Sequence, residues 1–286
     1  MAYGSIPSFA ANNRLTMFLP FTISSEEIKK LTRGHLLNRE FLDMYHSAQE
    51  VIKSCADINR IKDSLINGTK LQEQWFPVDV EWMNFDVFIS HSHKDMTPVI
   101  LPLASWMYEK LGLKCFVDSL FWLYADDLLK KMDEWYAKQP DGYYNYQTRN
   151  YTTSHVHAML SMALMKMMAK TECVIFVDSD NSIKYQKGDA QTPSPWIYEE
   201  INFAQNLQIA IPDRYVSHLI PICESGGALQ TRSFSASMDI RYDVDLSSFI
   251  SIKSKDLLTD YIMANRNKKA LDYLYSMALE LYKTNK

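Results

Sequence analysis

An α/β fold, with a central parallel sheet and helices on both of its faces, is predicted by two features of the sequence. Short apolar segments alternate with helical patterns along most of the chain, which is typical of a parallel sheet. The segment ECVIFVD (residues 172–178) contains five apolar residues in a row, as expected for a strand that is covered on both faces. The alternation begins only near residue 84, so two regions are expected.

A helical extension is predicted over residues 1–83. Residues 1–22 contain two prolines and two adjacent asparagines and are expected to be irregular. Ser24 and Glu27 fit a capping box, which predicts the start of a short helix. A longer helix is expected from about residue 38 to residue 65, where apolar residues recur at helical spacing until an Asn-Gly pair. No motif in this region carries chemistry.

The α/β domain is predicted over residues 84–286. Its strands are expected at residues 85–90, 114–118, 172–178, 218–223 and 238–245, the last of them at the edge of the sheet. Its helices are expected from the first strand to Gly112, then at residues 126–138, 154–170 and 194–207, and finally over residues 255–283. Ser154 and Ser194 are suitable N-caps for two of these helices.

Composition excludes several classes of function. The net charge is −4, from 30 basic and 34 acidic residues, and no basic run is present, so no nucleic-acid partner is expected. No apolar stretch approaches the roughly 20 residues of a membrane helix, and the N-terminal residues lack the pattern of a signal peptide. A cytoplasmic protein without a membrane partner is therefore expected. The four cysteines form no CxxC pair and are interpreted as reduced core thiols.

Polar residues stand where three of the predicted strands end. Ser90, His91 and Ser92 come at the end of the first strand, Asp118 ends the second, and a segment rich in serine and aspartate follows the third. Because ligands collect at the carboxyl ends of parallel strands, these residues are candidates for one site. The first of these loops has no glycine, so a Rossmann or P-loop phosphate cradle is absent.

Each of these candidates also has a purely structural interpretation. His91 and His93 could be loop residues that face solvent, Asp118 could cap a helix or form a turn, and Trp122 could pack in the core. Neither a nucleophile elbow nor an HExxH zinc motif occurs, and no metal is expected.

The segment SPWIYEEI (residues 194–201) places two adjacent glutamates on a predicted helix. Each residue turns a helix by about 100°, so Glu200 falls within about 40° of the apolar stripe and Glu199 about 140° away from it. Glu199 is therefore expected to face water. Glu200 is expected beside the apolar face, one turn after Trp196, where a carboxylate costs free energy unless it has a partner. A buried ion pair or cap is the structural alternative for Glu200.

Four segments together resemble the TIR (Toll/interleukin-1 receptor) domain family. They are FDVFISHSHKD, CFVDSLFW, SPWIYEEI and LIPICES, at residues 85–95, 115–122, 194–201 and 219–225. The resemblance covers about residues 84–285 and implies a flavodoxin-like TIR fold. The inserted segment YNYQTRNYTTSHVHAML and the full SPWIY resemble bacterial antiphage TIR proteins, such as the TIR subunit of the Thoeris system.

The resemblance implies an NAD+ glycohydrolase or cyclase that cleaves the bond between nicotinamide and ribose. The product would be ADP-ribose or a cyclic derivative that switches on a downstream effector in antiviral defence. NAD+ would be the substrate, no cofactor is expected, and self-association through TIR surfaces is implied. Glu200 is the expected catalytic carboxylate, and the expected substrate-binding residues are Ser90, His91, Ser92, Asp118, Phe121, Trp122 and Trp196.

Two alternatives are a nucleotide-binding effector that only senses a ligand and a TIR adaptor without enzymatic activity. Such an adaptor would act by homotypic interactions through the loop at residues 119–125, which resembles the BB loop of the family. The glutamate in register with Trp196 favours the enzyme over the adaptor.

Overall fold

The computed structural model describes residues 16–17, 19–55, 67–79, 84–186, 189–209 and 240–284. The strands are β1 (Thr16–Met17), β2 (Leu19–Ser24), β3 (Val87–Ser90), β4 (Cys115–Phe116), β5 (Cys173–Asp178), β6 (Lys184–Gln186), β7 (Asp189–Thr192), β8 (Gln208–Ile209), β9 (Tyr242–Asp243) and β10 (Ile250–Ser251). The helices are α1 (Ser25–Leu31), α2 (Arg39–Cys55), α3 (Gly68–Trp75), α4 (Leu101–Trp106), α5 (Asp118–Phe121), α6 (Ala125–Met132), α7 (Tyr146–Lys170), α8 (Pro195–Asn206), α9 (Ser254–Leu257), α10 (Asp260–Ala264) and α11 (Lys268–Thr284).

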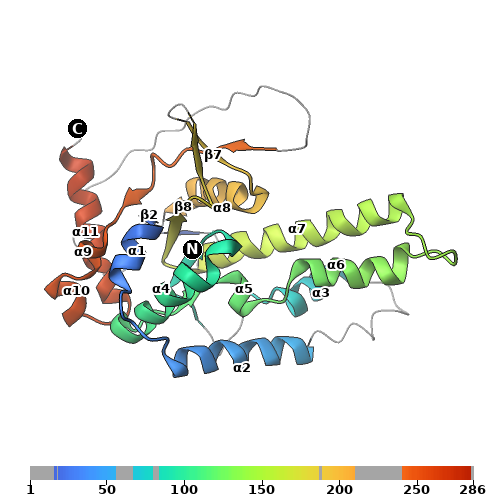
Figure 1. Ribbon diagram of the computed structural model, residues 1–286, viewed down its shortest axis with the longest axis horizontal. Helices are drawn as coiled ribbons and strands as arrows, with labels where there is room; N and C mark the ends of the chain where they lie inside the picture. Colours follow the sequence, from blue (N-terminus) through green and yellow to red (C-terminus); the bar gives the residue numbers. More distant parts are fainter. Residues whose placement is uncertain are drawn as a thin grey trace, which may run out of the picture.

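A five-stranded parallel sheet forms the centre of the molecule, with the order β10-β2-β5-β3-β4. Helices surround it (Figure 1). The predicted α/β class with a central parallel sheet is therefore confirmed. All five apolar residues of β5 are buried, as expected for a strand covered on both faces. Strand β3 lies between β4 and β5, so the chain crosses from one side of β3 to the other after β4.

Strand β2 corrects the expectation that residues 1–22 are irregular. Leu19, Phe21 and Ile23 alternate with more polar residues and are buried in the core, because β2 pairs with β5 along its whole length. Pro20 suggested a loop, but β10 pairs only with Phe21 and Thr22. At Pro20 the strand thus has a neighbour on one side only, where proline is tolerated. The boundary at residues 83/84 stays a prediction, although the sheet includes a strand from the predicted extension.

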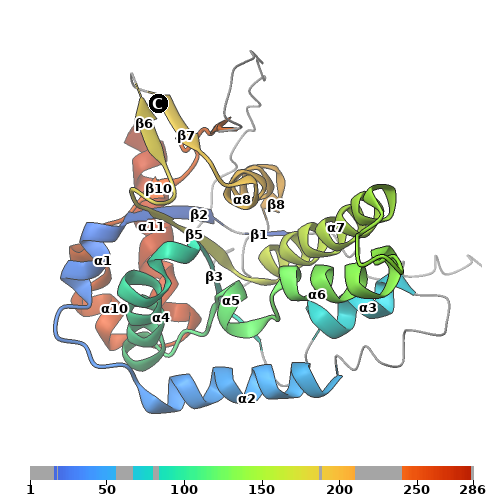
Figure 2. The ribbon, with the colours of Figure 1, turned by 45° about the vertical axis from the view of Figure 1, so that its right-hand side comes forward.

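The last two predicted strands have different outcomes. Residues 218–223 lie outside the described residues. The segment at residues 238–245 was expected at the edge of the central sheet, and this expectation is wrong for its described part. Strand β9 instead pairs with β7 in a small antiparallel sheet of order β6-β7-β9. The hairpin of β6 and β7 projects away from the central sheet (Figure 2).

Helix α7 is longer than predicted. Asn145 caps it by accepting a hydrogen bond from the backbone N–H of Thr148. Ser154, the predicted cap, lies inside the helix and donates to the carbonyl of Asn150. Helices α6 and α7 pack side by side and extend away from the sheet (Figures 1 and 2). Together they add a wall beside the carboxyl ends of the strands.

The other predicted caps and thiols mostly stand where expected. Ser24 and Ser194 cap α1 and α8 by accepting from the backbone N–H groups of Glu27 and Ile197. Cys115 and Cys173 are buried free thiols, as predicted. The side chain of Cys55 and all of Cys223 lie outside the described residues. Among the helices that the structure describes, none combines the length and the apolar character needed to cross a bilayer.

Candidate functional site

A pocket of about 330 Å³ opens at the carboxyl ends of β3 and β4. The loops after these strands form one side, and α7 and α8 form the other. Most of the residues predicted from the sequence line it, namely His91, Ser92, Asp118, Trp122, Trp196 and Glu200. The volume is at the lower end of the range for small-molecule sites. The carboxyl ends of the strands, where this pocket opens, are the usual ligand position in such sheets.

Glu200 is the buried carboxylate of this pocket, with 6% of its surface exposed. Ile197, Ile201 and Ala204 form the buried stripe of α8, and Glu200 lies next to that stripe as the helical periodicity predicts. The hydroxyl of Ser90, at the end of β3, donates to Glu200 Oε2 at 2.5 Å. The expected buried position of Glu200 is thus confirmed. Among the described residues, no lysine, arginine or histidine forms an ion pair with Glu200, so the alternative of a buried ion pair is not supported.

The environment of Glu200 favours its protonated form. Burial raises the pKa of Glu200 to about 8, and the negative charge of Asp118 acts in the same direction. The hydrogen bond from Ser90 and the nearby His93 partly oppose this rise in pKa. A carboxyl group that titrates near neutral pH in a pocket is a candidate for chemistry.

Glu199 has a more structured environment than predicted. It was expected to face water, but its Oε2 accepts a hydrogen bond from the Ser161 hydroxyl at 2.7 Å, and its side chain is half-buried. Ser161 belongs to α7, whose length was underestimated from the sequence. The expectation is therefore wrong in detail, because α7 covers the side of α8 that a helical wheel alone assigns to solvent.

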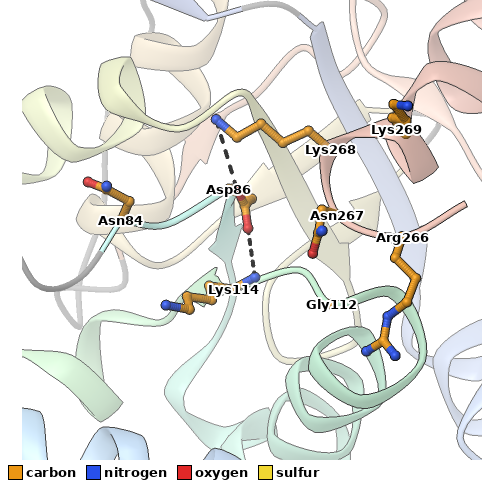
Figure 3. A pocket seen from close by; sticks show the side chains of 8 residues that line it. All are labelled: Asn84, Asp86, Gly112, Lys114, Arg266, Asn267, Lys268 and Lys269. Atoms are coloured by element: carbon orange, nitrogen blue, oxygen red, sulfur yellow. Dashed lines mark hydrogen bonds and ion pairs between the residues drawn. The ribbon is translucent and has the colours of Figure 1, made fainter.

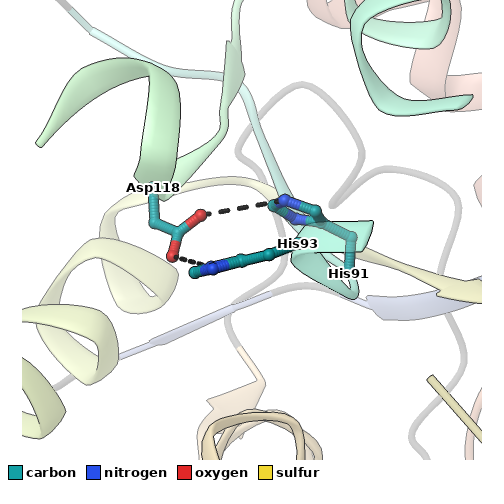
Figure 4. Close-up of side chains that lie close together, drawn as sticks. All are labelled: His91, His93 and Asp118. Carbon is teal, nitrogen blue, oxygen red and sulfur yellow. Dashed lines mark hydrogen bonds and ion pairs between the residues drawn. The ribbon is translucent and has the colours of Figure 1, made fainter. Parts of the chain in front are cut away.

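His91, His93 and Asp118 converge on one point (Figure 4). His93 Nε2 lies 3.2 Å from Asp118 Oδ2, and His91 Nε2 lies 3.9 Å from Asp118 Oδ1. The hydrogen bond to Asp118 raises the pKa of His93, while burial lowers the pKa of His91. Burial acts to raise the pKa of Asp118, but the hydrogen bond from His93 and the charge of the two imidazoles hold it below its usual value.

The positions of His91, His93 and Asp118 bear on whether these residues are structural or belong to the pocket. His91 is buried, so it is not a solvent-facing loop residue, whereas His93 is exposed. Asp118 opens α5 but its carboxylate also faces the pocket.

The aromatic candidates divide into two groups. Trp196 lines the pocket and meets the ring of His157 edge-on at 5.1 Å. Trp122 also lines the pocket, but it is buried, donates from Nε1 to the Pro77 carbonyl and packs against the core. Phe121 is fully buried among core rings and does not belong to the pocket lining. Among the predicted aromatic residues, Trp196 is thus the best placed to contact a ligand, and the exposed Tyr124 lines the same pocket.

Two contributions to the site were missed from the sequence. Leu160 and Leu164 of α7 form an apolar side of the pocket; their helical spacing was visible, but not the surface they face. Asp95 is buried and accepts hydrogen bonds from Ser179 and Asn181. This network ties the loop after β5 to the loop after β3, and the run of serine, aspartate and asparagine after β5 was the available signal.

A second hollow, of about 700 Å³, lies at the opposite ends of the strands (Figure 3). Its lining is basic, with Lys114, Arg266, Lys268 and Lys269. Asp86 lies within it and accepts a hydrogen bond from the backbone N–H of Lys114. Although it is larger, this hollow is an open surface depression in which the carboxylate already has cationic neighbours, so the pocket around Glu200 is the better candidate site.

Comparison with known proteins identifies no similar family or protein. No family model matches the chain, and neither a curated protein nor a solved structure does. The family resemblance therefore depends on the sequence motifs alone.

Proposed function

We propose that this protein is a TIR-type NAD+ glycohydrolase or cyclase, with Glu200 as its catalytic carboxylate. The observation that supports this function best is the position of Glu200. It is buried at the carboxyl edge of a parallel sheet, it faces a pocket with Trp196, and its hydrogen bond comes from a neutral hydroxyl rather than from a cation. When strands are counted from β3, the order β5-β3-β4 also agrees with the 3-1-2 order of a flavodoxin-like sheet, although β2 lies beside β5, where such a sheet has its fourth strand.

The proposed reaction needs one carboxylate and no general acid. The bond between ribose C1′ and the nicotinamide nitrogen breaks, and its electron pair goes to the nitrogen, which was cationic and leaves neutral. Positive charge then develops on the ribose as an oxocarbenium ion, as in glycoside cleavage. A preorganised anion beside that charge stabilises the transition state more than the ground state. Glu200 supplies this anion.

A raised pKa is compatible with that role. In the free protein Glu200 is mostly protonated at neutral pH, because its pKa is about 8. The nicotinamide cation of a bound substrate brings the opposite charge, which favours the ionised carboxylate. Glu200 is therefore expected to be mainly neutral in the free protein and to become ionised when the cationic substrate binds. This is consistent with the lack of an arginine or lysine bonded to Glu200 among the described residues.

The acceptor of the ribosyl cation determines the product. Water gives ADP-ribose, whereas a nucleophilic atom of the same dinucleotide gives a cyclic product. Leu160, Leu164 and Trp122 provide apolar surface on the pocket, and excluding water would favour the cyclic product. Either product would act as a nucleotide signal to a separate effector in antiviral defence.

Self-association is part of the proposal. A dinucleotide is larger than a pocket of about 330 Å³ comfortably encloses, so part of the ligand would extend beyond it. The segment at residues 119–125 borders the opening, and a second copy that packs there would complete the site and close it to water. Specific activity should then rise with protein concentration. A constant specific activity over several decades of concentration, with activity present, would exclude this step.

The deciding experiment is the incubation of the purified full-length protein with NAD+, followed by chromatography for free nicotinamide. We expect release of nicotinamide together with ADP-ribose or a cyclic isomer. Because activity could depend on assembly, the assay should be repeated at high protein concentration and with a crowding agent. If a folded protein that self-associates releases no nicotinamide under any of these conditions, the enzymatic function is excluded and the adaptor function is favoured.

A further inference from the structure

We propose that His91, His93 and Asp118 form a binding site for one divalent transition-metal ion of the zinc class. One ligand atom from each residue, a ring nitrogen of each histidine and a carboxylate oxygen of Asp118, lies within 4.8 Å of the others. In Figure 4 the Asp118 carboxylate points at both imidazole rings. The proposal goes beyond cleavage of NAD+ and does not depend on it, and it departs from the sequence-based expectation of no metal.

The strongest observation is the orphaned nitrogen of His91. Its Nδ1 lies 3.1 Å from the Ile89 carbonyl, and a carbonyl only accepts, so we assign the ring proton to Nδ1. Nε2 then carries a lone pair, is buried and has no hydrogen-bond partner in the described structure. Leaving such a buried polar atom unsatisfied is unfavourable in a folded protein. A metal ion is a partner that a lone pair in this position can bind.

The group that faces this nitrogen is also an acceptor. Asp118 Oδ1 lies 3.9 Å from His91 Nε2, so a lone pair and a carboxylate oxygen point toward each other across a gap. Two acceptors in this arrangement repel unless a cation lies between them. The third ligand atom, Nε2 of His93, lies 3.2 Å from the other oxygen of the same carboxylate, to which it is hydrogen-bonded, and it would release the shared proton when a metal ion binds. The cluster is thus arranged for a shared positive charge.

The separations suit a small ion. Zinc binds histidine nitrogen and carboxylate oxygen at about 2.0–2.2 Å, which puts neighbouring ligand atoms about 3.4 Å apart in a tetrahedron. The distances of 3.2 and 3.9 Å join the two histidine nitrogens to different oxygens of the Asp118 carboxylate, and they lie on either side of this value. Imidazole ligands favour zinc, iron, nickel and copper over magnesium and calcium.

The surroundings hold the ligands as metal sites usually require. A ligating histidine normally donates its other ring N–H to a carbonyl or carboxylate, as His91 does to Ile89. Asp118 is oriented by the backbone N–H of Ser119, which donates to Oδ1 at 2.7 Å. Three protein ligands leave at least one coordination position open. That position faces the pocket, because all three ligands line it, and it would take an oxygen donor such as water or phosphate.

The test uses the full-length protein without an affinity tag, treated with a chelator that is then removed. Titration with Zn²⁺ by calorimetry should show one equivalent bound with a micromolar or lower Kd, without competition from millimolar Mg²⁺. His93→Ala and Asp118→Asn should each weaken binding by about tenfold or more. His155→Ala is the matched control, since it removes an exposed histidine outside the cluster, and it should bind like the unchanged protein.

A second readout reports the ligands directly. Co²⁺ in place of Zn²⁺ should give visible absorption bands of a site with nitrogen and oxygen ligands, and these bands should disappear in Asp118→Asn. Thermal unfolding of each variant establishes that it is folded, and His93 is exposed enough for its loss to be tolerated. The proposal is overturned if the folded protein binds no Zn²⁺, if His93→Ala and Asp118→Asn bind as tightly as the unchanged protein, or if His155→Ala weakens binding equally.

Discussion

The two ends of the central sheet stabilise partly or fully buried carboxylates in different ways. At the amino ends, Asp86 and Glu172 immediately precede β3 and β5, and Lys268 lies 3.8 Å from both. At the carboxyl ends, Glu200 receives a hydrogen bond from the Ser90 hydroxyl, and a buried imidazole nitrogen has no hydrogen-bond partner within the described structure. One end of the sheet neutralises its acids, whereas the other leaves an acid and a base available.

This difference separates groups that maintain the fold from groups that are available for chemistry. Burial raises the pKa of Asp86, but the backbone hydrogen bond and the charge of Lys268 oppose the rise. Burial raises the pKa of Glu200 to about 8, and the charge of Asp118 adds to the effect. Strongly shifted groups that face a pocket are concentrated at functional sites. The two ends therefore make opposite predictions for substitutions of their carboxylates.

Glu200→Gln should have the largest effect on activity. The substitution keeps the size of the side chain and its ability to accept from Ser90, but it removes the charge. If that charge supplies about 3 kcal/mol of transition-state stabilisation, nicotinamide release should fall about 100-fold. The melting temperature should stay the same or rise, because a buried acid without a cationic partner is removed. A folded Glu200→Gln protein with full activity would refute the assignment.

Asp86→Ala should show the reverse pattern. It removes the acceptor for the backbone N–H of Lys114 and one of the two carboxylates near Lys268, so a partly buried donor loses its partner. The free energy of unfolding should fall by about 1–3 kcal/mol, measured by urea denaturation. Nicotinamide release at a temperature where the variant is folded should stay within a few-fold of the unchanged protein. A 100-fold loss of activity in this variant would mean that the two ends do not differ as described.

The pH dependence should follow the titration of Glu200. If the ionised carboxylate of the free enzyme is required, kcat/KM should rise about tenfold between about pH 7 and pH 9, around the pKa of about 8. Glu200→Gln should lose this rise. A profile that is flat across this range in the active protein would show that the ionised form is not required.

Stability should respond to pH in the opposite direction. The folded state keeps the Glu200 proton up to about pH 8, whereas the unfolded state loses it near its ordinary pKa of about 4.3. The folded state therefore binds more protons between these two values, and the contribution of Glu200 to stability decreases as the pH rises through this window. The melting temperature of Glu200→Gln relative to the unchanged protein should accordingly increase with pH. A difference that does not vary with pH would contradict the shifted pKa.

The sequence predicts the centre of the fold and the site better than its periphery. The apolar run of β5 reflects burial on both faces of the sheet, and the periodicity of α8 reflects burial along one face of the helix, so each leaves a local pattern in the sequence. Strand β2 was missed because Pro20 is a loop signal, and only the short pairing partner β10 makes it acceptable. The small sheet that contains β9 was missed because pairing partners far apart in the sequence leave no periodic trace.

Within the site, residue identity was easier to predict than residue environment. Ser90, Asp118 and Glu200 were chosen because of their places at strand ends and on a helical face, and they line or border one pocket. The helical wheel could not show that α7 covers Glu199, nor that Phe121 is buried among core rings. The convergence of two imidazoles on one carboxylate was also invisible, because it depends on side-chain rotamers from two loops.

Glu199→Gln should have the smallest effect, and it is the sharpest control for Glu200. It changes the same charge on the same helix, one residue away, but its side chain is half-buried against Ser161 instead of facing the pocket. The amide oxygen of the substituted side chain would still accept from the Ser161 hydroxyl, so the cost should not exceed the roughly 0.5–1.5 kcal/mol of one hydrogen bond. Nicotinamide release and the melting temperature should both stay close to those of the unchanged protein. Equal losses of activity in Glu199→Gln and Glu200→Gln would show that any charge change on α8 disturbs the pocket, and that the burial of Glu200 has no special role in catalysis.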